Sequence, residues 1–92
     1  MKYLKVIWHH DFPDEPVTLF SEIDDERYEV RKVDVYRDGR CDFADSFTSK
    51  GTTMLGEIAT PSIEELAELE EFTPSEIEVG EFEAIWQRAK RN

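Results

Sequence analysis

Three kinds of side chain in this sequence could take part in chemistry: adjacent histidines, a lone cysteine and abundant carboxylates. The run His9-His10-Asp11 contains residue types that bind metal ions. Neighbouring residues on an extended strand point to opposite faces, so both imidazoles reach one ion only if the segment forms a loop. No HExxH spacing supplies a further ligand. We interpret both as ordinary histidines, with His10 able to hydrogen-bond Asp11, and keep a metal site as an alternative.

Cys41 lies on a segment of alternating hydrophobicity and is interpreted as a small buried hydrophobe. A cysteine nucleophile needs a base and surroundings that lower its pKa, whereas the neighbouring Asp42 and Asp45 would raise it. Carboxylate pairs are plentiful, but a chain of 92 residues leaves little room for the deep cavity that an enzyme usually needs. We therefore expect no catalytic residue, no cofactor and no metal.

The charge is strongly acidic and unevenly distributed. The chain has 22 Asp and Glu against 11 Lys and Arg, a net charge of −11. Residues 51–87 contain ten glutamates and no lysine or arginine, and residues 88–92 restore three positive charges. Such a chain repels nucleic-acid phosphates and anionic lipid. A solvated surface that keeps a small protein soluble is one interpretation of this charge. The absence of any balancing lysine in residues 51–87 supports the other, a surface complementary to a basic protein partner.

The carboxylates expected to contact a partner lie on the helical part of the chain and in two loops. The helical set comprises Glu64, Glu65, Glu68, Glu71, Glu81 and Glu83. The loop sets comprise Asp11, Asp14 and Glu15 in one loop and Asp24, Asp25 and Glu26 in the other. In an antiparallel meander these two loops fall at opposite ends of the sheet, so the two loop sets are not expected to merge.

The first half of the chain has the two-residue periodicity of strands, which are predicted over 2–8, 17–23, 27–37 and 40–47. The apolar parity changes within the third segment, which indicates a bulge near Arg31-Lys32 or a strand covered on both faces. Asp38-Gly39 predicts a type I′ hairpin turn. These segments predict a four-stranded antiparallel meander.

The second half changes to helical periodicity. Residues 48–61 are expected to form a long loop with a short strand near 55–58. Ser62 and Glu65 have the spacing of a capping box and predict a helix start. Thr73-Pro74 predicts another helix start, and Gly80 is expected to separate that turn from a last amphipathic helix. The apolar face of this last helix contains Phe82, Ile85, Trp86 and Ala89.

The predicted fold class is α+β, a single domain over residues 1–92. Its parts are a sheet over 1–47, a loop over 48–61 and a helical part over 62–92, whose two helices pack on one sheet face. The aromatic residues supply core material, and Trp8 and Phe12 fit either a core or a binding platform. The charged residues of the central strand, Glu29 to Asp34, fit either cross-strand ion pairs or an exposed recognition face.

One cysteine excludes an internal disulfide. The start of the chain has no signal-peptide pattern, and no apolar run approaches the roughly 18 residues that span a bilayer. We therefore expect a cytoplasmic protein.

Several runs of residues resemble one uncharacterised bacterial family. They are His10-Asp11-Phe12-Pro13-Asp14-Glu15-Pro16, Phe20-Ser21-Glu22-Ile23-Asp24, Glu29-Val30-Arg31-Lys32-Val33 and Glu81-Phe82-Glu83-Ala84. Together with Trp8 and Pro61-Ser62-Ile63-Glu64-Glu65, they resemble the family called domain of unknown function 6881 over nearly the whole chain. The resemblance implies a small bacterial protein, similar in size and acidity to immunity proteins, and it implies no catalytic residue.

The expected function is that of a non-enzymatic protein-binding domain, monomeric alone and heterodimeric with a basic partner. The most specific expectation is a bacterial immunity protein that occludes a basic toxin, for example a nuclease. One alternative is a DNA mimic or regulatory inhibitor of a nucleic-acid-binding protein. Another is a small metal-binding or enzymatic domain using His9-His10-Asp11, and a third is a self-associating domain.

Overall fold

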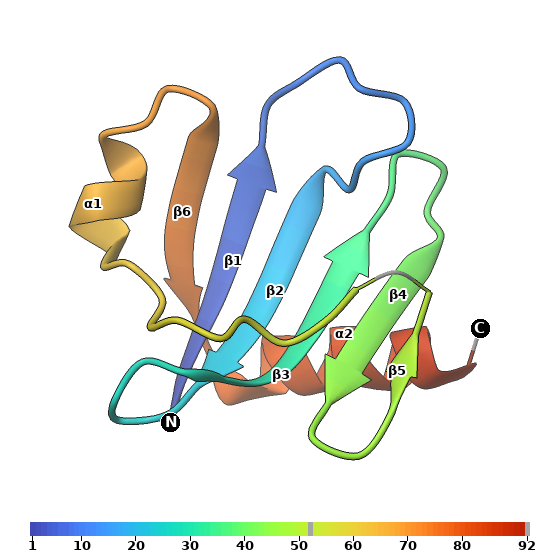
Figure 1. Ribbon diagram of the computed structural model, residues 1–92. Coiled ribbons are helices and arrows are strands. Elements are labelled where there is room, and N and C mark those ends of the chain that lie inside the picture. Colours follow the sequence, from blue (N-terminus) through green and yellow to red (C-terminus); the bar gives the residue numbers. More distant parts are fainter. Residues whose placement is uncertain (52, 92) are drawn as a thin grey trace.

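The computed structural model describes residues 1–51 and 53–91 and contains one antiparallel sheet with a long helix across one face (Figure 1). The strands are β1 (Lys2–Trp8), β2 (Thr18–Ile23), β3 (Glu29–Val35), β4 (Cys41–Asp45), β5 (Ser49–Lys50) and β6 (Phe72–Ile77), and the helices are α1 (Ile63–Ala67) and α2 (Val79–Arg91). The strand order is β5-β4-β3-β2-β1-β6. The α+β class and the meander of β1 to β4 are confirmed, but the sheet has six strands rather than four.

The largest error of the sequence prediction concerns the segment after Thr73. It forms strand β6, which pairs antiparallel with β1 and places Pro74 opposite Val6. A proline fits there because β6 is an edge strand, which is hydrogen-bonded on one side only. The helix start at Thr73-Pro74 is therefore wrong, and the part of the chain expected to be helical contains a strand. Gly80 lies within the first turn of α2.

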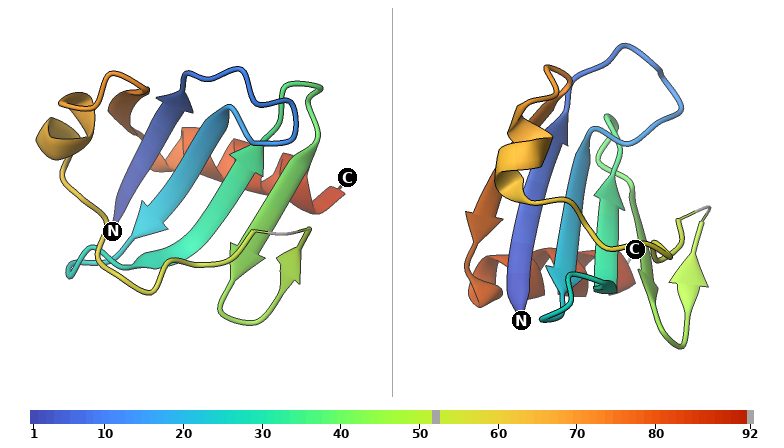
Figure 2. Two further views of the ribbon diagram at one scale, coloured as in Figure 1. Left: turned by 45° about the horizontal axis from the view of Figure 1, so that its top comes forward. Right: turned by 60° about the vertical axis from the view of Figure 1, so that its left-hand side comes forward.

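The predicted strand near 55–58 is also wrong, since these residues form no strand. The strand in this part of the chain is β5, which pairs with β4 at the other edge of the sheet (Figure 2). The β3–β4 turn differs from type I′. Gly39 has a positive φ of 92°, its N–H donates to the Tyr36 carbonyl (2.9 Å), and Asp38 keeps a negative φ. This is a three-residue hairpin loop with a left-handed last residue. The bulge lies at Val30, one residue before its predicted position.

Helix α2 and the sheet face beneath it form the core. Phe20, Val33 and Cys41 from the strands pack against Phe82, Trp86 and Ala89 from the helix, and all six are buried. The predictions that Trp86 is a core residue and Cys41 a buried hydrophobe are confirmed. Burial raises the pKa of the Cys41 thiol, which keeps it protonated and unreactive at neutral pH.

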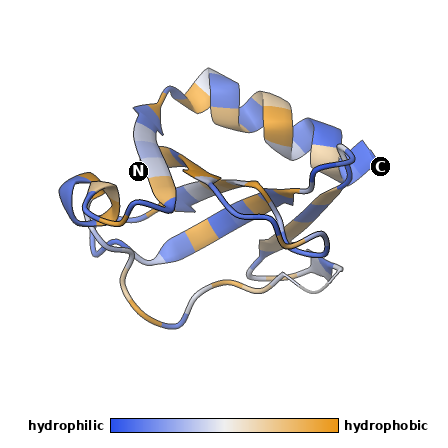
Figure 3. Cartoon of the chain, turned by 90° about the horizontal axis from the view of Figure 1, so that it is seen from above, coloured by the Kyte–Doolittle hydropathy of each residue, from blue (hydrophilic) through white to orange (hydrophobic). Residues whose placement is uncertain are grey.

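The opposite sheet face is crossed by the segment 53–62, which lies on the far side of the sheet from α2 (Figure 3). Helix α1 follows this segment and contacts β6, whereas α2 is the only helix that covers the core face among the described residues. The predicted packing of both helices on one sheet face is therefore wrong. The capping box that begins α1 is confirmed: the Glu65 N–H donates to Ser62 Oγ (3.1 Å), and the Ser62 N–H donates to Glu65 Oε1 (3.2 Å).

Candidate functional site

The carboxylates of the predicted helical set do not form one patch. Glu64 and Glu65 lie on α1, Glu81 and Glu83 lie on α2, and β6 lies between the two helices (Figure 1). Glu64 and Glu81 are exposed. The Glu65 carboxylate caps its own helix, and the hydrogen bond that it accepts from the Ser62 N–H lowers its pKa. Glu83 forms an ion pair of 2.6 Å with Arg31. Two carboxylates of the predicted helical set, Glu65 and Glu83, therefore already have structural roles within the protein.

The two loop sets lie at opposite ends of the sheet, as predicted. Asp24 begins the β2–β3 turn, and its Oδ1 accepts the N–H groups of Glu26 and Tyr28, each at 2.9 Å. Asp25 and Glu26 are exposed in this turn. Asp11, Asp14 and Glu15 lie in the β1–β2 loop at the other end, and all three are exposed. Asp11 and Asp14 of this second set flank the exposed Phe12 in the sequence.

Residues 8–16 and 68–72 come together at that end of the sheet, which we call the aromatic end. The His9 N–H donates to the Glu71 carbonyl (2.7 Å), so the β1–β2 loop and the α1–β6 turn lie side by side (Figure 1). Trp8 Nε1–H donates to Glu71 Oε2 (3.3 Å). The turn thereby brings Glu71 of the helical set to the loop that carries Asp11, Asp14 and Glu15, and the exposed Glu68 lies three residues before Glu71.

A row of rings supports this end. The centroids of Trp8 and His10 are 4.3 Å apart, and those of His10 and Phe12 are 5.4 Å apart. The centroid of the Phe72 ring lies 6.3 Å from that of Trp8. Phe12, the last ring of the row, is 60% exposed. From the sequence, Trp8 and Phe12 fit either a core or a binding platform, and the ring of His10 between them is the part that sequence reasoning missed.

His10 holds the loop in shape. Its Nδ1 accepts the N–H of Phe12 (2.9 Å), and its Nε2 lies 2.8 Å from the Pro16 carbonyl oxygen. A carbonyl only accepts, so Nε2 must carry the proton and the ring is the neutral Nε2–H tautomer. The hydrogen bond expected between His10 and Asp11 is replaced by these two. His9 Nε2 instead contacts Thr73 Oγ1 (2.7 Å).

A cavity of about 390 Å³ opens at the aromatic end and is lined by Trp8, Phe12, Pro13, Asp14 and Glu15. Its walls combine two aromatic rings with two carboxylates. Arg37 from the β3–β4 hairpin reaches the same end, where its Nη2–H donates to the His10 carbonyl (2.8 Å). The arrangement offers an apolar surface with a negative rim, which suits a cationic or basic ligand.

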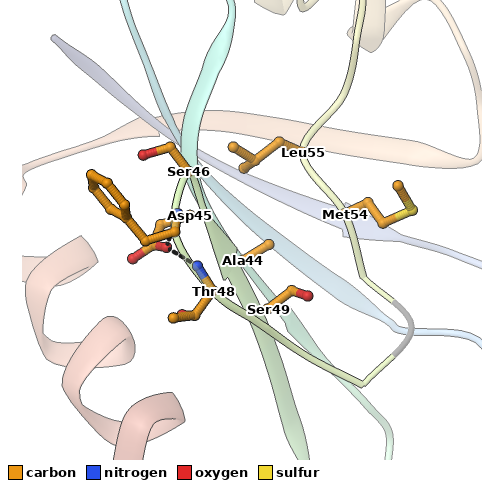
Figure 4. A pocket seen from close by; sticks show the side chains of 8 residues that line it. Ala44, Asp45, Ser46, Thr48, Ser49, Met54 and Leu55 are labelled. Atoms are coloured by element: carbon orange, nitrogen blue, oxygen red, sulfur yellow. Dashed lines mark hydrogen bonds between the residues drawn. The ribbon is translucent and has the colours of Figure 1, made fainter.

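The second cavity, about 400 Å³, lies between the β4–β5 hairpin and residues 54–55 (Figure 4). Its one carboxylate, Asp45, accepts the N–H groups of Thr48 (2.7 Å) and Phe47 (2.8 Å), which lower its pKa. The Phe47 side chain is 92% exposed. The one carboxylate that lines this cavity therefore already accepts hydrogen bonds from the backbone of its own hairpin.

The charged residues of β3 do not form the exposed recognition face considered from the sequence. Arg31 donates to both oxygens of Glu22 (2.7 and 2.9 Å) beneath α2, and these hydrogen bonds are the main cause of a lowered Glu22 pKa. The Arg31 guanidinium also lies 5.0 Å from the centre of the Phe82 ring and 5.1 Å from that of Trp86. Arg31 thus links the sheet to the helix.

On the opposite face, Asp34 and Asp42 are directly opposed on β3 and β4, and each is 6% exposed. Thr53 Oγ1–H donates to Asp34 Oδ2, and Tyr36 O–H donates to Asp42 Oδ2 (3.0 Å). Asp34 Oδ1 receives no hydrogen bond from the described residues, and Lys32 Nζ lies 3.9 Å from it. Burial raises the pKa of Asp34 above its ordinary value.

We expect Asp34→Asn to stabilise the protein at pH 7 by on the order of 1 kcal/mol, because a buried ionised oxygen without a donor is costly. A raised folded pKa means that the folded state holds more protons than the unfolded state between the two pKa values. Stability therefore falls as pH rises through that window. The gain should shrink towards pH 4, as thermal unfolding at both pH values will measure. Asp25→Asn, in an exposed turn, is the control, and an equal gain there would refute this account.

The chain therefore forms an acidic α+β domain, and its aromatic end has a cavity lined by aromatic rings and carboxylates. It belongs to the family described as Domain of unknown function (DUF6881), whose model matches residues 2–91. No curated protein and no solved structure matches the chain. Within residues 1–51 and 53–91, no helix is long and apolar enough to cross a membrane, and no three His, Cys, Asp or Glu residues are grouped as a metal site.

Proposed function

We propose that this protein is a non-enzymatic binding domain that holds a basic protein partner against the aromatic end. The observation that carries the proposal is Phe12, an exposed ring backed by the Trp8–His10 row and surrounded by exposed carboxylates. A few residues carry most of the binding energy of a protein interface, and aromatic side chains are enriched among them, while the surrounding charges steer association. The aromatic end has both.

The finer proposal is an immunity protein that occludes a basic toxin. A toxin that acts on nucleic acid must gather lysine and arginine to bind phosphates. Carboxylates at the aromatic end, Asp11, Asp14 and Glu15 among them, would take the place of those phosphates. The net charge of −11 would speed the encounter and weaken it at high salt.

The test begins with capture of the partner. The tagged protein is incubated with lysate of its source cell at low and high salt, and retained proteins are identified by mass spectrometry. The partner is then expressed in a bacterial host with and without this protein. We expect a basic partner that high salt releases and whose toxicity this protein relieves. Retention of acidic partners only would contradict the binding proposal. Displacement by duplex DNA without any toxicity would favour a DNA mimic instead of an immunity protein.

Charge reversal tests which surface associates. Asp11→Lys with Glu68→Lys reverses two exposed carboxylates of the aromatic end, and lysine at the α1 C-cap also suits the helix dipole. We expect association with the captured partner at low salt to slow by about tenfold and to depend less on salt. The measurement is stopped-flow association across a salt series.

The control is Asp25→Lys with Glu26→Lys, which makes the same change of net charge at the opposite end of the sheet. Its association rate should stay close to that of the unaltered protein. Equal slowing in both double variants would mean that net charge alone, and not the aromatic end, directs the encounter.

A further inference from the structure

Arg31 is an internal example of a cation that this protein holds between aromatic rings and carboxylates. The Arg31 guanidinium lies against two aromatic rings, Phe82 and Trp86, at 5.0 and 5.1 Å from their centres. Two carboxylates, Glu22 and Glu83, hold its nitrogen atoms at 2.7 and 2.6 Å. A planar guanidinium suits this setting, because its faces stack on rings while its edges donate to carboxylates.

The cavity at the aromatic end has the same composition as the Arg31 site. Two rings, Trp8 and Phe12, and two carboxylates, Asp14 and Glu15, line its walls together with Pro13. No basic residue is among these lining residues, and the nearby Arg37 donates to the backbone carbonyl of His10. We propose that this cavity binds an arginine side chain of the partner, an inference that rests on the proposed function.

The site is built before any ligand arrives. His10 fixes the loop through Phe12 N–H and the Pro16 carbonyl, and the Trp8 ring is held by Glu71. The 390 Å³ cavity is large enough for a guanidinium with its alkyl chain. A loop that is already ordered loses little conformational entropy on binding, so the contacts with the arginine retain most of their energy.

A small probe tests the cavity without a protein partner. N-acetyl-arginine amide is titrated into isotopically labelled protein while the indole N–H resonance of Trp8 is followed by NMR. N-acetyl-citrulline amide, which has the same shape but no charge, is the matched ligand. We expect a saturable Trp8 shift with the arginine probe, with a Kd on the order of 1–10 mM for so small a ligand. The citrulline probe should bind at least fivefold more weakly, and the buried Trp86 indole should not respond.

Two variants of equal charge complete the test. Asp14→Asn with Glu15→Gln should remove the preference for arginine, whereas Asp25→Asn with Glu26→Gln at the opposite end should keep it. Equal binding of both probes, or an equal loss in both variants, would overturn the arginine site. A captured partner that binds the Asp14→Asn, Glu15→Gln protein as tightly as the unaltered one would also overturn it, while leaving the proposed function standing. A saturable arginine site in a protein that retains no basic partner would instead overturn the proposed function.

Discussion

Replacing Arg31 with methionine should lower the free energy of unfolding by about 3–5 kcal/mol, the usual cost of removing one partner of a buried ion pair. Glu22, 6% exposed, would be left beneath α2 without the two hydrogen bonds that Arg31 donates. Glu83 would lose its ion pair, and Phe82 and Trp86 would lose the guanidinium against their rings. Since small domains are stable by only about 5–15 kcal/mol, much of the protein should unfold at moderate urea concentrations. Urea titration followed by circular dichroism measures the loss.

The double variant Arg31→Met, Glu22→Leu separates the buried charge from the lost packing. Removing both charges together often restores stability, because no ion is left unpaired in the interior. We expect the double variant to be clearly more stable than Arg31→Met alone. If the two unfold at the same urea concentration, the lost packing around the rings accounts for the effect and the charge does not.

The same pair sets part of the acid stability. Arg31 lowers the folded pKa of Glu22, so the stability from this carboxylate is present above its unfolded pKa and is lost as pH falls through the lowered value. The unaltered protein should therefore lose stability on acidification in this range. The Arg31→Met protein should lose less over the same range.

The second large effect is expected for Phe82→Ala, at about 3–5 kcal/mol. Phe82 is fully buried, packs at 5.4 Å from the Tyr3 ring and stacks at 6.3 Å on Trp86. Its removal leaves a cavity beneath the first turns of α2, the only helix that covers this face in the described structure. Val79→Ala, at an exposed position of the same helix, is the control. Urea unfolding measures both, and a loss below about 1 kcal/mol for Phe82→Ala would contradict the described core.

Local sequence signals predicted the parts of the fold that depend on neighbours in the chain. Strands β1 to β4, the Ser62–Glu65 capping box and the apolar face of α2 are all present. Thr73-Pro74 misled the prediction because its local pattern is that of a helix start. The free edge of β1, almost 70 residues earlier in the chain, decided the outcome. A pairing over such a distance leaves no mark on the residues nearby.

The candidate site was predicted in part for the same reason. The acidic composition of residues 9–16 was plain, and so was the separation of Asp11 and Asp14 from the turn at Asp24. What the sequence could not show is that Glu71 would lie beside Trp8, since the contact depends on the unpredicted strand β6. Nor could it show that Glu83 would be taken up by Arg31, because α2 had to cross the sheet to bring the two together.

The pairing of β6 with β1 also sets the point during synthesis at which the sheet can be completed. Strand β1 precedes β6 by more than 60 residues in the chain, so one of its two edges stays unpaired until residues 72–77 have been synthesised. Non-local pairings of this kind slow folding, because a long loop must close before they form. The aromatic end needs both residues 8–16 and the turn before β6, so a nascent or truncated chain lacks it. This surface can therefore form only after residues 68–77 have been synthesised.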